Sequence, residues 1–177
     1  MREQLKKILL QKSVIIGREF KLSSGRTSNF YVDARVTTLD PEGAFLCGKI
    51  FLEMLKDFKI DAIGGYSIGA DPIVSSIAVL SYLEKRPIPA FIIRKEEKSH
   101  GTRKSIEGNI PLNGRVVLFD DVVTSGSSIL KGVVQVEARG CTVEAVMAVI
   151  DREEGGRGKI EASGHTFFSI FTKSDLI

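Results

Sequence analysis

The chain has 177 residues, a length that suits one domain with a single sizeable core. Hydrophobic residues make up 43% of the sequence and charged residues 27%, which argues against a disordered or fibrous protein. The formal net charge of +3 is too small to indicate nucleic-acid binding by itself. Any basic function must therefore come from local clusters of lysine and arginine.

Two cysteines, Cys47 and Cys141, cannot build a disulfide framework or a four-cysteine metal site. This usage predicts a reducing, cytoplasmic compartment. The apolar run at residues 8–10 is too short for a signal peptide or a membrane span, so no membrane association is expected.

The first forty residues predict one helix and two strands. Leu5, Ile8 and Leu9 share one face of a helix over residues 3–12. Extended runs at 18–22 and 29–33 flank a Ser- and Gly-containing stretch, which predicts two strands joined by a turn.

The rest of the chain alternates strands with helices. Asp40 followed by Pro41 predicts a helix start, and Asp71 followed by Pro72 predicts another. A third helix is expected to follow the small residues at 125–127 and to close at Gly140 in the C′ position. Apolar runs predict strands at residues 60–65, 87–93, 115–122, 142–150 and 166–171. Continuous apolar strands between helices predict an α/β fold with a mostly parallel sheet flanked by helices.

The strongest chemical signal lies where the strand over 115–122 ends. Four apolar residues lead into Asp120 and Asp121, and a loop rich in Thr, Ser and Gly then opens a helix. Open α/β sheets bind ligands at this end of their strands, and a helix N-terminus presents free N–H groups to anions. Carboxylates suit hydroxyl groups or a divalent cation, so the whole stretch predicts a site for a phosphorylated sugar. No Gly-Lys-Ser/Thr follows, which excludes the nucleoside-triphosphate P-loop.

This stretch resembles the phosphoribosyl-pyrophosphate (PRPP) motif of the type I phosphoribosyltransferases. The resemblance implies that the two acids hold the ribose hydroxyls and that the loop wraps the 5′-phosphate. The implied PRPP-binding residues here are Asp120, Asp121, Val122, Val123, Thr124, Ser125, Gly126, Ser127 and Ser128.

Three further segments resemble the orotate-specific members of that family. Residues 94–101 resemble their mobile catalytic loop, 20–33 the N-terminal segment that covers the base, and 151–156 the turn whose arginine meets orotate. Residues 64–72 stand where the family has its pyrophosphate loop. The resemblance implies that PRPP is also bound by Arg94, Lys95, Lys98 and His100, and that Lys98, His100 and Asp121 are catalytic. It implies that orotate is bound by Thr124, Arg152, Ser24 and Tyr31.

The resemblance also implies how the chain is organised. Residues 1–40 would form an N-terminal helix and a hood over the base, and residues 41–177 a phosphoribosyltransferase core. It implies Mg²⁺ as cofactor, held mainly through PRPP, with Asp120 and Asp121 as the candidate protein ligands. It implies a homodimer in which the basic loop of one subunit acts at the site of the other.

Two alternatives remain open on the sequence. Ser23 stands where many orotate-specific members have a lysine, and Ile68-Gly69 where some carry a pyrophosphate-binding lysine. A phosphoribosyltransferase for uracil or a purine is one alternative. The other is a PRPP-sensing regulator that binds nucleic acid through the basic side chains between Arg94 and Lys104. Nucleic acid is not the expected partner, because only a short helix precedes Phe20 and nothing resembles a helix-turn-helix.

Overall fold

The computed structural model describes residues 1–21, 27–95 and 105–177. Its main sheet consists of β3 (Ala62–Tyr66), β4 (Ala90–Ile93), β5 (Ile106–Gly108), β6 (Arg115–Val123), β7 (Thr142–Asp151) and β8 (Phe167–Thr172). The strand order is β5-β4-β3-β6-β7-β8, and every neighbouring pair is parallel except β4 with β5. The predicted α/β fold with a mostly parallel sheet is therefore confirmed.

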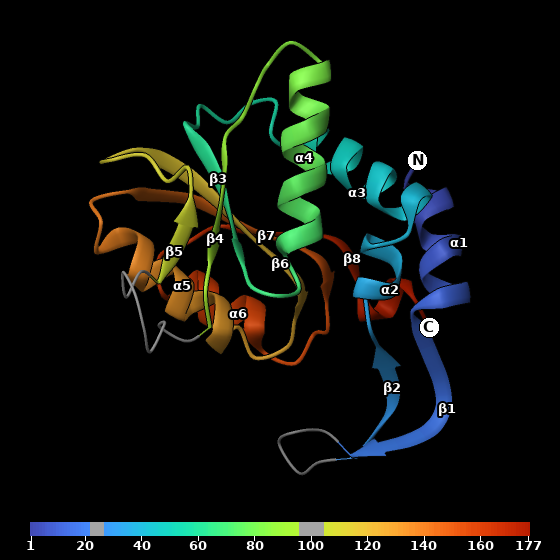
Figure 1. Ribbon diagram of the computed structural model, residues 1–177. Helices are drawn as coiled ribbons and strands as arrows, with labels where there is room; N and C mark the ends of the chain where they lie inside the picture. Colours follow the sequence, from blue (N-terminus) through green and yellow to red (C-terminus); the bar gives the residue numbers. More distant parts are fainter. Residues whose placement is uncertain (22–26, 96–104) are drawn as a thin grey trace.

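Helices cover both faces of this sheet (Figure 1). Those of the main body are α3 (Pro41–Met54), α4 (Asp71–Leu83), α5 (Ser127–Glu137) and α6 (Gly156–Ala162). Residues of α3 and α4 pack with Val117 and Phe119 of β6 in one buried cluster. Residues of α5 and α6 pack with Val116 and Leu118 in a second cluster, because side chains alternate between the faces along a strand. Within the described residues, no helix is long and apolar enough to cross a bilayer.

The N-terminal elements are α1 (Arg2–Lys12), β1 (Val14–Lys21), β2 (Thr27–Val32) and the short α2 (Arg35–Thr38). The strands β1 and β2 form an antiparallel pair that projects away from the main sheet (Figure 1). In α1, Leu5, Ile8 and Leu9 are buried in the same cluster as α3, as the helical spacing predicts. The first helix is therefore anchored to the main body by apolar packing.

The two predicted Asp-Pro helix starts behave differently. Asp40 caps α3, because its carboxylate accepts hydrogen bonds from the N–H groups of Glu42 and Gly43, both at 3.1 Å. In α4, Asp71 is already helical, and its side chain faces Ser67 instead of capping. The Asp71 carboxylate therefore bonds to the loop between β3 and α4 and not to the first turn of its own helix.

Several elements differ from the sequence predictions. The strand β1 begins at Val14 and not at 18, and α2, α6 and the final 3₁₀ turn η1 (Lys173–Asp175) had no strong pattern. The strand β5 lies between the predicted strands at 87–93 and 115–122, where the sequence predicted no element, because three residues are too few for a periodicity to appear. The prediction that α5 closes at Gly140 was wrong. The helix ends at Glu137, and Gly140, with a φ of 80°, belongs to the turn that follows.

Candidate active site

The two acids at the end of β6 point in different directions. Successive side chains of a strand face opposite sides of the sheet. Asp120 lies on the side of α5, near Tyr66 of β3: burial raises the pKa of the Tyr66 hydroxyl, and the charge of Asp120 raises it further. Asp121 lies against Gly69 in the β3–α4 loop, where a Cβ added to the glycine would meet the Asp121 carboxylate at 2.2 Å. The strand therefore supplies one carboxylate to each of two adjoining recesses.

Asp120 is buried at 9% exposure. Its Oδ1 accepts a hydrogen bond from the N–H of Asp121 at 2.9 Å. Burial raises the pKa of the Asp120 carboxyl well above its ordinary value, and the neighbouring charge of Asp121 raises it further. A ligand that brings hydroxyl donors or a cation to this carboxylate would offset the unfavourable burial of its charge.

The loop after β6 forms a small anion-binding cradle. The N-cap of α5 is Gly126, with a φ of 71°, a conformation that favours glycine. Gly126 offers no side chain to cap α5, and the N–H of Ser127 donates to Ser125 Oγ only at the long distance of 3.5 Å, so the first N–H groups of α5 can still turn to an anion. The cradle encloses about 80 Å³ and is lined by Asp120, Val122, Val123, Thr124, Ser125, Gly126, Ser127, Ser128 and Ile129.

Arg152 is brought beside this cradle by the pairing of β6 with β7. Val123 lies opposite Asp151 in the ladder, and the N–H of Arg152 donates to the carbonyl of Val123 at 2.9 Å. The Arg152 side chain is 8% exposed, and its Nη2 lies 2.8 Å from Glu154 Oε1. Its buried Nε has no hydrogen-bond partner among the described residues. An anionic ligand in the adjoining cavity could accept from this nitrogen.

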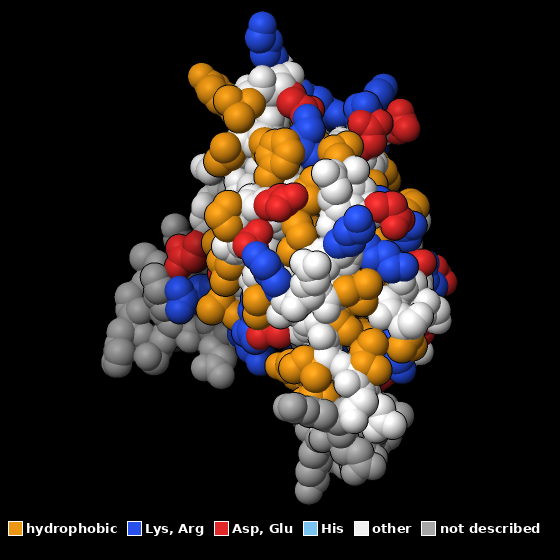
Figure 2. Space-filling view, turned by 90° about the vertical axis from the view of Figure 1, so that its right-hand side faces the viewer, with side chains coloured by type: hydrophobic (Ala, Val, Ile, Leu, Met, Phe, Trp, Pro, Cys, Tyr) orange, Lys and Arg blue, Asp and Glu red, His pale blue; other side chains and the backbone are white. Residues whose placement is uncertain are grey.

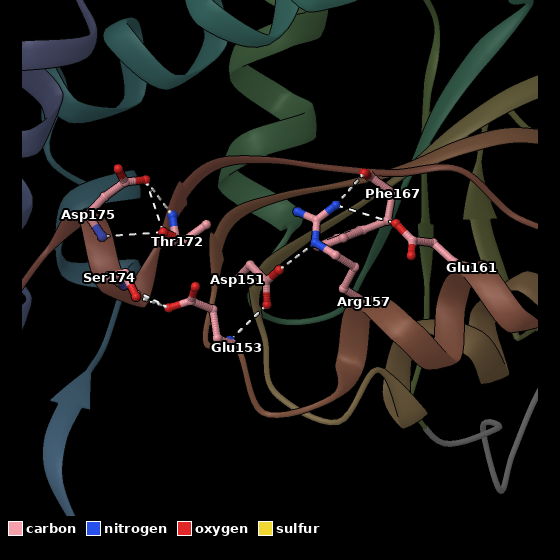
Figure 3. Close-up of polar contacts among 8 residues, drawn as sticks. All are labelled: Asp151, Glu153, Arg157, Glu161, Phe167, Thr172, Ser174 and Asp175. Carbon is pink, nitrogen blue, oxygen red and sulfur yellow. Dashed lines mark hydrogen bonds and ion pairs between the residues drawn. The ribbon is translucent and has the colours of Figure 1, made fainter.

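A polar network fixes the turn that carries Arg152 (Figure 3). The carboxylate of Asp151, 1% exposed, accepts from the N–H of Glu153 at 2.9 Å and from Arg157 Nε at 3.1 Å. The carboxylate of Glu153 accepts in turn from the N–H and the hydroxyl of Ser174, at 2.8 and 2.6 Å. The turn is therefore tied to α6 on one side and to η1 on the other.

A cavity of about 270 Å³ joins Asp121 to Arg152. The predicted orotate-binding Tyr31 borders it, with its ring stacked on Phe20 at 5.0 Å between centroids. Asp33 and Arg35 also border the cavity, although neither was a predicted site residue. The complete lining is Tyr31, Val32, Asp33, Arg35, Gly69, Asp121, Val122, Thr124 and Arg152.

A larger cavity, of about 510 Å³, lies on the other side of the β3–α4 loop. The predicted PRPP-binding residues Arg94 and Lys95 line it, and Arg94 Nη1 lies 3.7 Å from Glu107 Oε1. Asp71 lines it as well and accepts a hydrogen bond from Ser67 at 3.0 Å. Burial raises the pKa of the Asp71 carboxyl, and the bond from Ser67 lowers it in part.

The predicted residues Ser24, Lys98 and His100 lie outside the described parts of the chain. The other predicted site residues border the three recesses around the ends of β3, β6 and β7. In residues 1–21, 27–95 and 105–177, no group of three His, Cys, Asp or Glu side chains is placed to hold a metal.

We expect Gly69→Ala to weaken PRPP binding. The new methyl group would lie 2.2 Å from Oδ1 and 2.4 Å from Cγ of Asp121, so the carboxylate must leave its position. Displacing one charged hydrogen-bonding group costs about 10- to 100-fold in affinity, measurable as the KM for PRPP. Gly158→Ala is the matched control, because a Cβ there meets nothing within 4 Å. An unchanged KM for PRPP in Gly69→Ala would contradict the placement of Asp121 in the site.

Known proteins resemble this chain in both sequence and fold. No family model matches the sequence. The chain is 46% identical to the orotate phosphoribosyltransferase of Aquifex aeolicus, over 99% of this chain and 97% of that protein. It superposes with a TM-score of 0.86 on the crystal structure of Mycobacterium tuberculosis H37Rv orotate phosphoribosyltransferase in complex with Fe(III) dicitrate, at 36% identity. The PRPP complex of the same enzyme gives a TM-score of 0.83 at 34% identity. Each alignment covers 99% of this chain and 98% of the other.

The acidic strand end, the small-residue loop at the N-terminus of α5 and the mostly parallel sheet define a type I phosphoribosyltransferase. The curated relatives that match almost the whole chain are named for the same acceptor base, which is orotate. The chain belongs to the orotate phosphoribosyltransferase family.

Proposed function

We propose that this protein transfers ribose 5-phosphate from PRPP to orotate, giving orotidine 5′-monophosphate and pyrophosphate in pyrimidine biosynthesis. The observation that carries the proposal is the single cavity shared by Asp121, Thr124 and Arg152. It adjoins the anion cradle at α5, so a sugar phosphate and a planar anionic base can lie side by side. Family membership supports the same substrates.

The base is proposed to lie between Arg152 and the N-terminal hood, residues 1–40. The unpartnered Nε of Arg152 suits an anionic acceptor of orotate, and Thr124 adds a hydroxyl on the same side. Tyr31, on β2, offers a ring at the edge of the cavity. The remaining predicted contact, Ser24, lies outside the described residues.

The transfer separates charge, and the proposed residues can stabilise both the positive and the negative charge that develop. Positive charge develops on the ribose ring as its bond to the diphosphate breaks, and negative charge develops on the leaving diphosphate. Asp120 and Asp121 lie where carboxylates can hold the ribose, and Arg94 and Lys95 line the cavity proposed for the diphosphate. Preorganised charges of this kind stabilise a transition state without rearranging as it forms. The proposed catalytic residues Lys98 and His100 lie outside the described ranges.

The proposed cofactor is Mg²⁺, which would neutralise charge on the diphosphate when bound. Asp120 and Asp121 are hard oxygen ligands beside the proposed ribose position, and Mg²⁺ commonly uses one or two carboxylates together with substrate oxygens. The donor set therefore fits a cation that arrives with PRPP better than a resident metal, since the described residues hold no three-ligand cluster.

The experiment that tests the function is the loss of orotate absorbance on adding PRPP and Mg²⁺ to the purified protein. We expect a loss that requires both additions, with omission of each as a control. Uracil, adenine and hypoxanthine tested in parallel address the alternative base. Folded protein that binds PRPP and never consumes orotate would overturn the proposal.

A homodimer is the proposed assembly. Exposed apolar side chains lie on α2 and just after it, at Val36 and Leu39, and on α4, at Val79, Tyr82 and Leu83. Figure 2 shows hydrophobic side chains in a column down the left margin of the molecule. Exposed apolar side chains that gather in this way are typical of protein interfaces. We propose that a second copy of the chain covers those of α2 and α4.

Mixing two inactive variants tests whether the basic loop acts in the partner's site. Each of Lys98→Ala and Asp121→Ala removes one proposed catalytic residue. Subunit exchange gives about half heterodimers, each with one intact site if the loop acts in trans, so about a quarter of wild-type activity should return. Recovery that stays at zero after verified exchange would show that each loop serves its own subunit.

The proposed location is the cytoplasm. Cys47 and Cys141 are both free and buried in the structure. Burial raises the pKa of the Cys47 thiol to about 12, so it stays protonated and unreactive at neutral pH. Two unpaired thiols are typical of proteins in a reducing compartment.

A further inference from the structure

We infer that Arg35 is a substrate-binding residue, which pairs with the diphosphate of PRPP beside the β3–α4 loop. The inference rests on the proposed function and adds a residue to it. Three observations support it: the position of Arg35 on the cavity, the way Asp33 holds its side chain, and the lack of a cation within the loop itself.

Arg35 is held in one orientation by Asp33. Arg35 Nε lies 2.8 Å from Asp33 Oδ1, Nη2 lies 2.9 Å from Oδ2, and the Arg35 N–H donates to Oδ1 at 3.1 Å. A guanidinium carries five N–H donors, so this fork leaves Nη1 and one proton of Nη2 for another acceptor. The side chain is 46% exposed, so a ligand in the cavity can reach these donors.

The fork directs Arg35 toward Asp121 and Gly69. All of these residues border the 270 Å³ cavity. The Asp33 carboxylate raises the pKa of the Arg35 guanidinium most, and the Asp121 carboxylate raises it further through space. Arg35 therefore lies within electrostatic range of the carboxylate proposed to hold the ribose, close to the carbon at which the diphosphate is attached.

The β3–α4 loop contributes no cation of its own. It consists of Ser67, Ile68, Gly69 and Ala70, and Asp71 follows at the start of α4. A diphosphate beside this loop needs positive charge from other elements. Arg94 and Lys95 supply it on one side of Ile68, and Arg35 supplies it on the other, since Arg35 lines the cavities that contain Gly69 and Pro72.

The diphosphate fits Arg35 better than the orotate carboxylate does. Arg35 borders two cavities, and the second, of about 610 Å³, contains Ile68 and Asp71 but neither Thr124 nor Arg152. The residues proposed for the base thus lie at only one of the two recesses that Arg35 reaches. While Nε and Nη2 of Arg35 hold Asp33, the remaining protons on Nη1 and Nη2 form a second edge of the planar guanidinium. Such an edge is well suited to a phosphate group, which accepts bidentate hydrogen bonds from arginine.

Direct binding of inorganic pyrophosphate, with Mg²⁺, to Arg35→Ala is the test. We expect the Kd for pyrophosphate to rise about 10- to 100-fold and the Kd for ribose 5-phosphate to stay within about twofold. The KM for PRPP should rise in parallel while the KM for orotate is unchanged. Arg35→Lys keeps the charge without the fork and should restore part of the pyrophosphate affinity.

Arg139→Ala is the matched control, because it removes the same charge from an exposed position on the loop between α5 and β7, at the other end of the sheet. Unchanged pyrophosphate affinity in both Arg35 variants would overturn the inference. A rise in the KM for orotate alone would overturn it too, and would assign Arg35 to the base. These readouts differ from those of the proposed function, which fails if the wild-type protein does not consume orotate.

Discussion

Asp120→Asn should make the protein more stable and nearly inactive at the same time. Asparagine keeps an oxygen that can accept from the N–H of Asp121 but removes a charge that burial disfavours. We expect the melting temperature near neutral pH to rise by about 2–6 °C. Loss of the carboxylate proposed to hold the ribose should lower kcat/KM for PRPP by about 100- to 1000-fold.

The gain in stability should depend on pH in a defined direction. The pKa of Asp120 is raised in the folded state, so folding binds a proton between the ordinary and the raised value, and the contribution of this group to stability falls as pH rises through that interval. Below the ordinary pKa of aspartate, about 3.9, the side chain is neutral in both states and the variant should melt with the wild type.

Asp121→Asn is the matched control for this effect. Asp121 is only half-buried, so its replacement should lower activity without raising the melting temperature. If Asp120→Asn melts at or below the wild type near neutral pH, the buried charge is not the destabilising group that the structure indicates.

Arg152→Ala should raise the KM for orotate by about 100-fold and leave the KM for PRPP almost unchanged. Arg152 lines the cavity, its buried Nε has no hydrogen-bond partner among the described residues, and bidentate pairing with a carboxylate is among the strongest polar contacts in proteins. Steady-state kinetics with each substrate varied in turn measures the two constants. Arg152→Lys should recover only part of the loss, because a single ammonium cannot reproduce the planar fork.

Lys173→Ala is the control for Arg152→Ala, because it removes a positive charge near the same aromatic ring without removing a residue that lines the cavity. The guanidinium of Arg152 lies 5.8 Å from the centre of the Phe30 ring, and Lys173 Nζ lies 5.7 Å from the same ring. Lys173 is absent from the lining of the cavity among the described residues. Equal effects of the two substitutions on the KM for orotate would show that Arg152 acts through the ring and not on the base.

The sequence predicted those parts of the fold that extend over many residues. Apolar runs located the five parallel strands of the main sheet, and Asp40 with Pro41 located the start of α3. The sequence also predicted a ligand site with Asp120 and Thr124, because a buried strand that leads through two acids into a small-residue loop is typical of such sites, and in the structure both residues line recesses at the end of β6. The three-residue strand β5 was missed, because pairing with β4 and not periodicity defines it.

The sequence analysis missed those parts of the site whose positions depend on how separate elements pack together. Arg35 lies two residues after the end of the strand predicted at 29–33, where the sequence predicted no element, and its place on the cavity depends on how β2 leads into α2. An Asp-x-Arg spacing is a weak signal of a fixed fork. The opposite orientation of Asp120 and Asp121 follows from strand alternation and could have been deduced, whereas the contact of Asp121 with Gly69 could not.

The two hydrogen bonds from Ser174 to Glu153 connect η1 to the turn that carries Arg152, the residue proposed to bind the base. Ser174 borders no proposed substrate, yet it holds the carboxylate of the residue that follows Arg152. Cleavage after Thr172 would remove this anchor and loosen the turn that carries Arg152, although it would delete none of the residues that line the cavity.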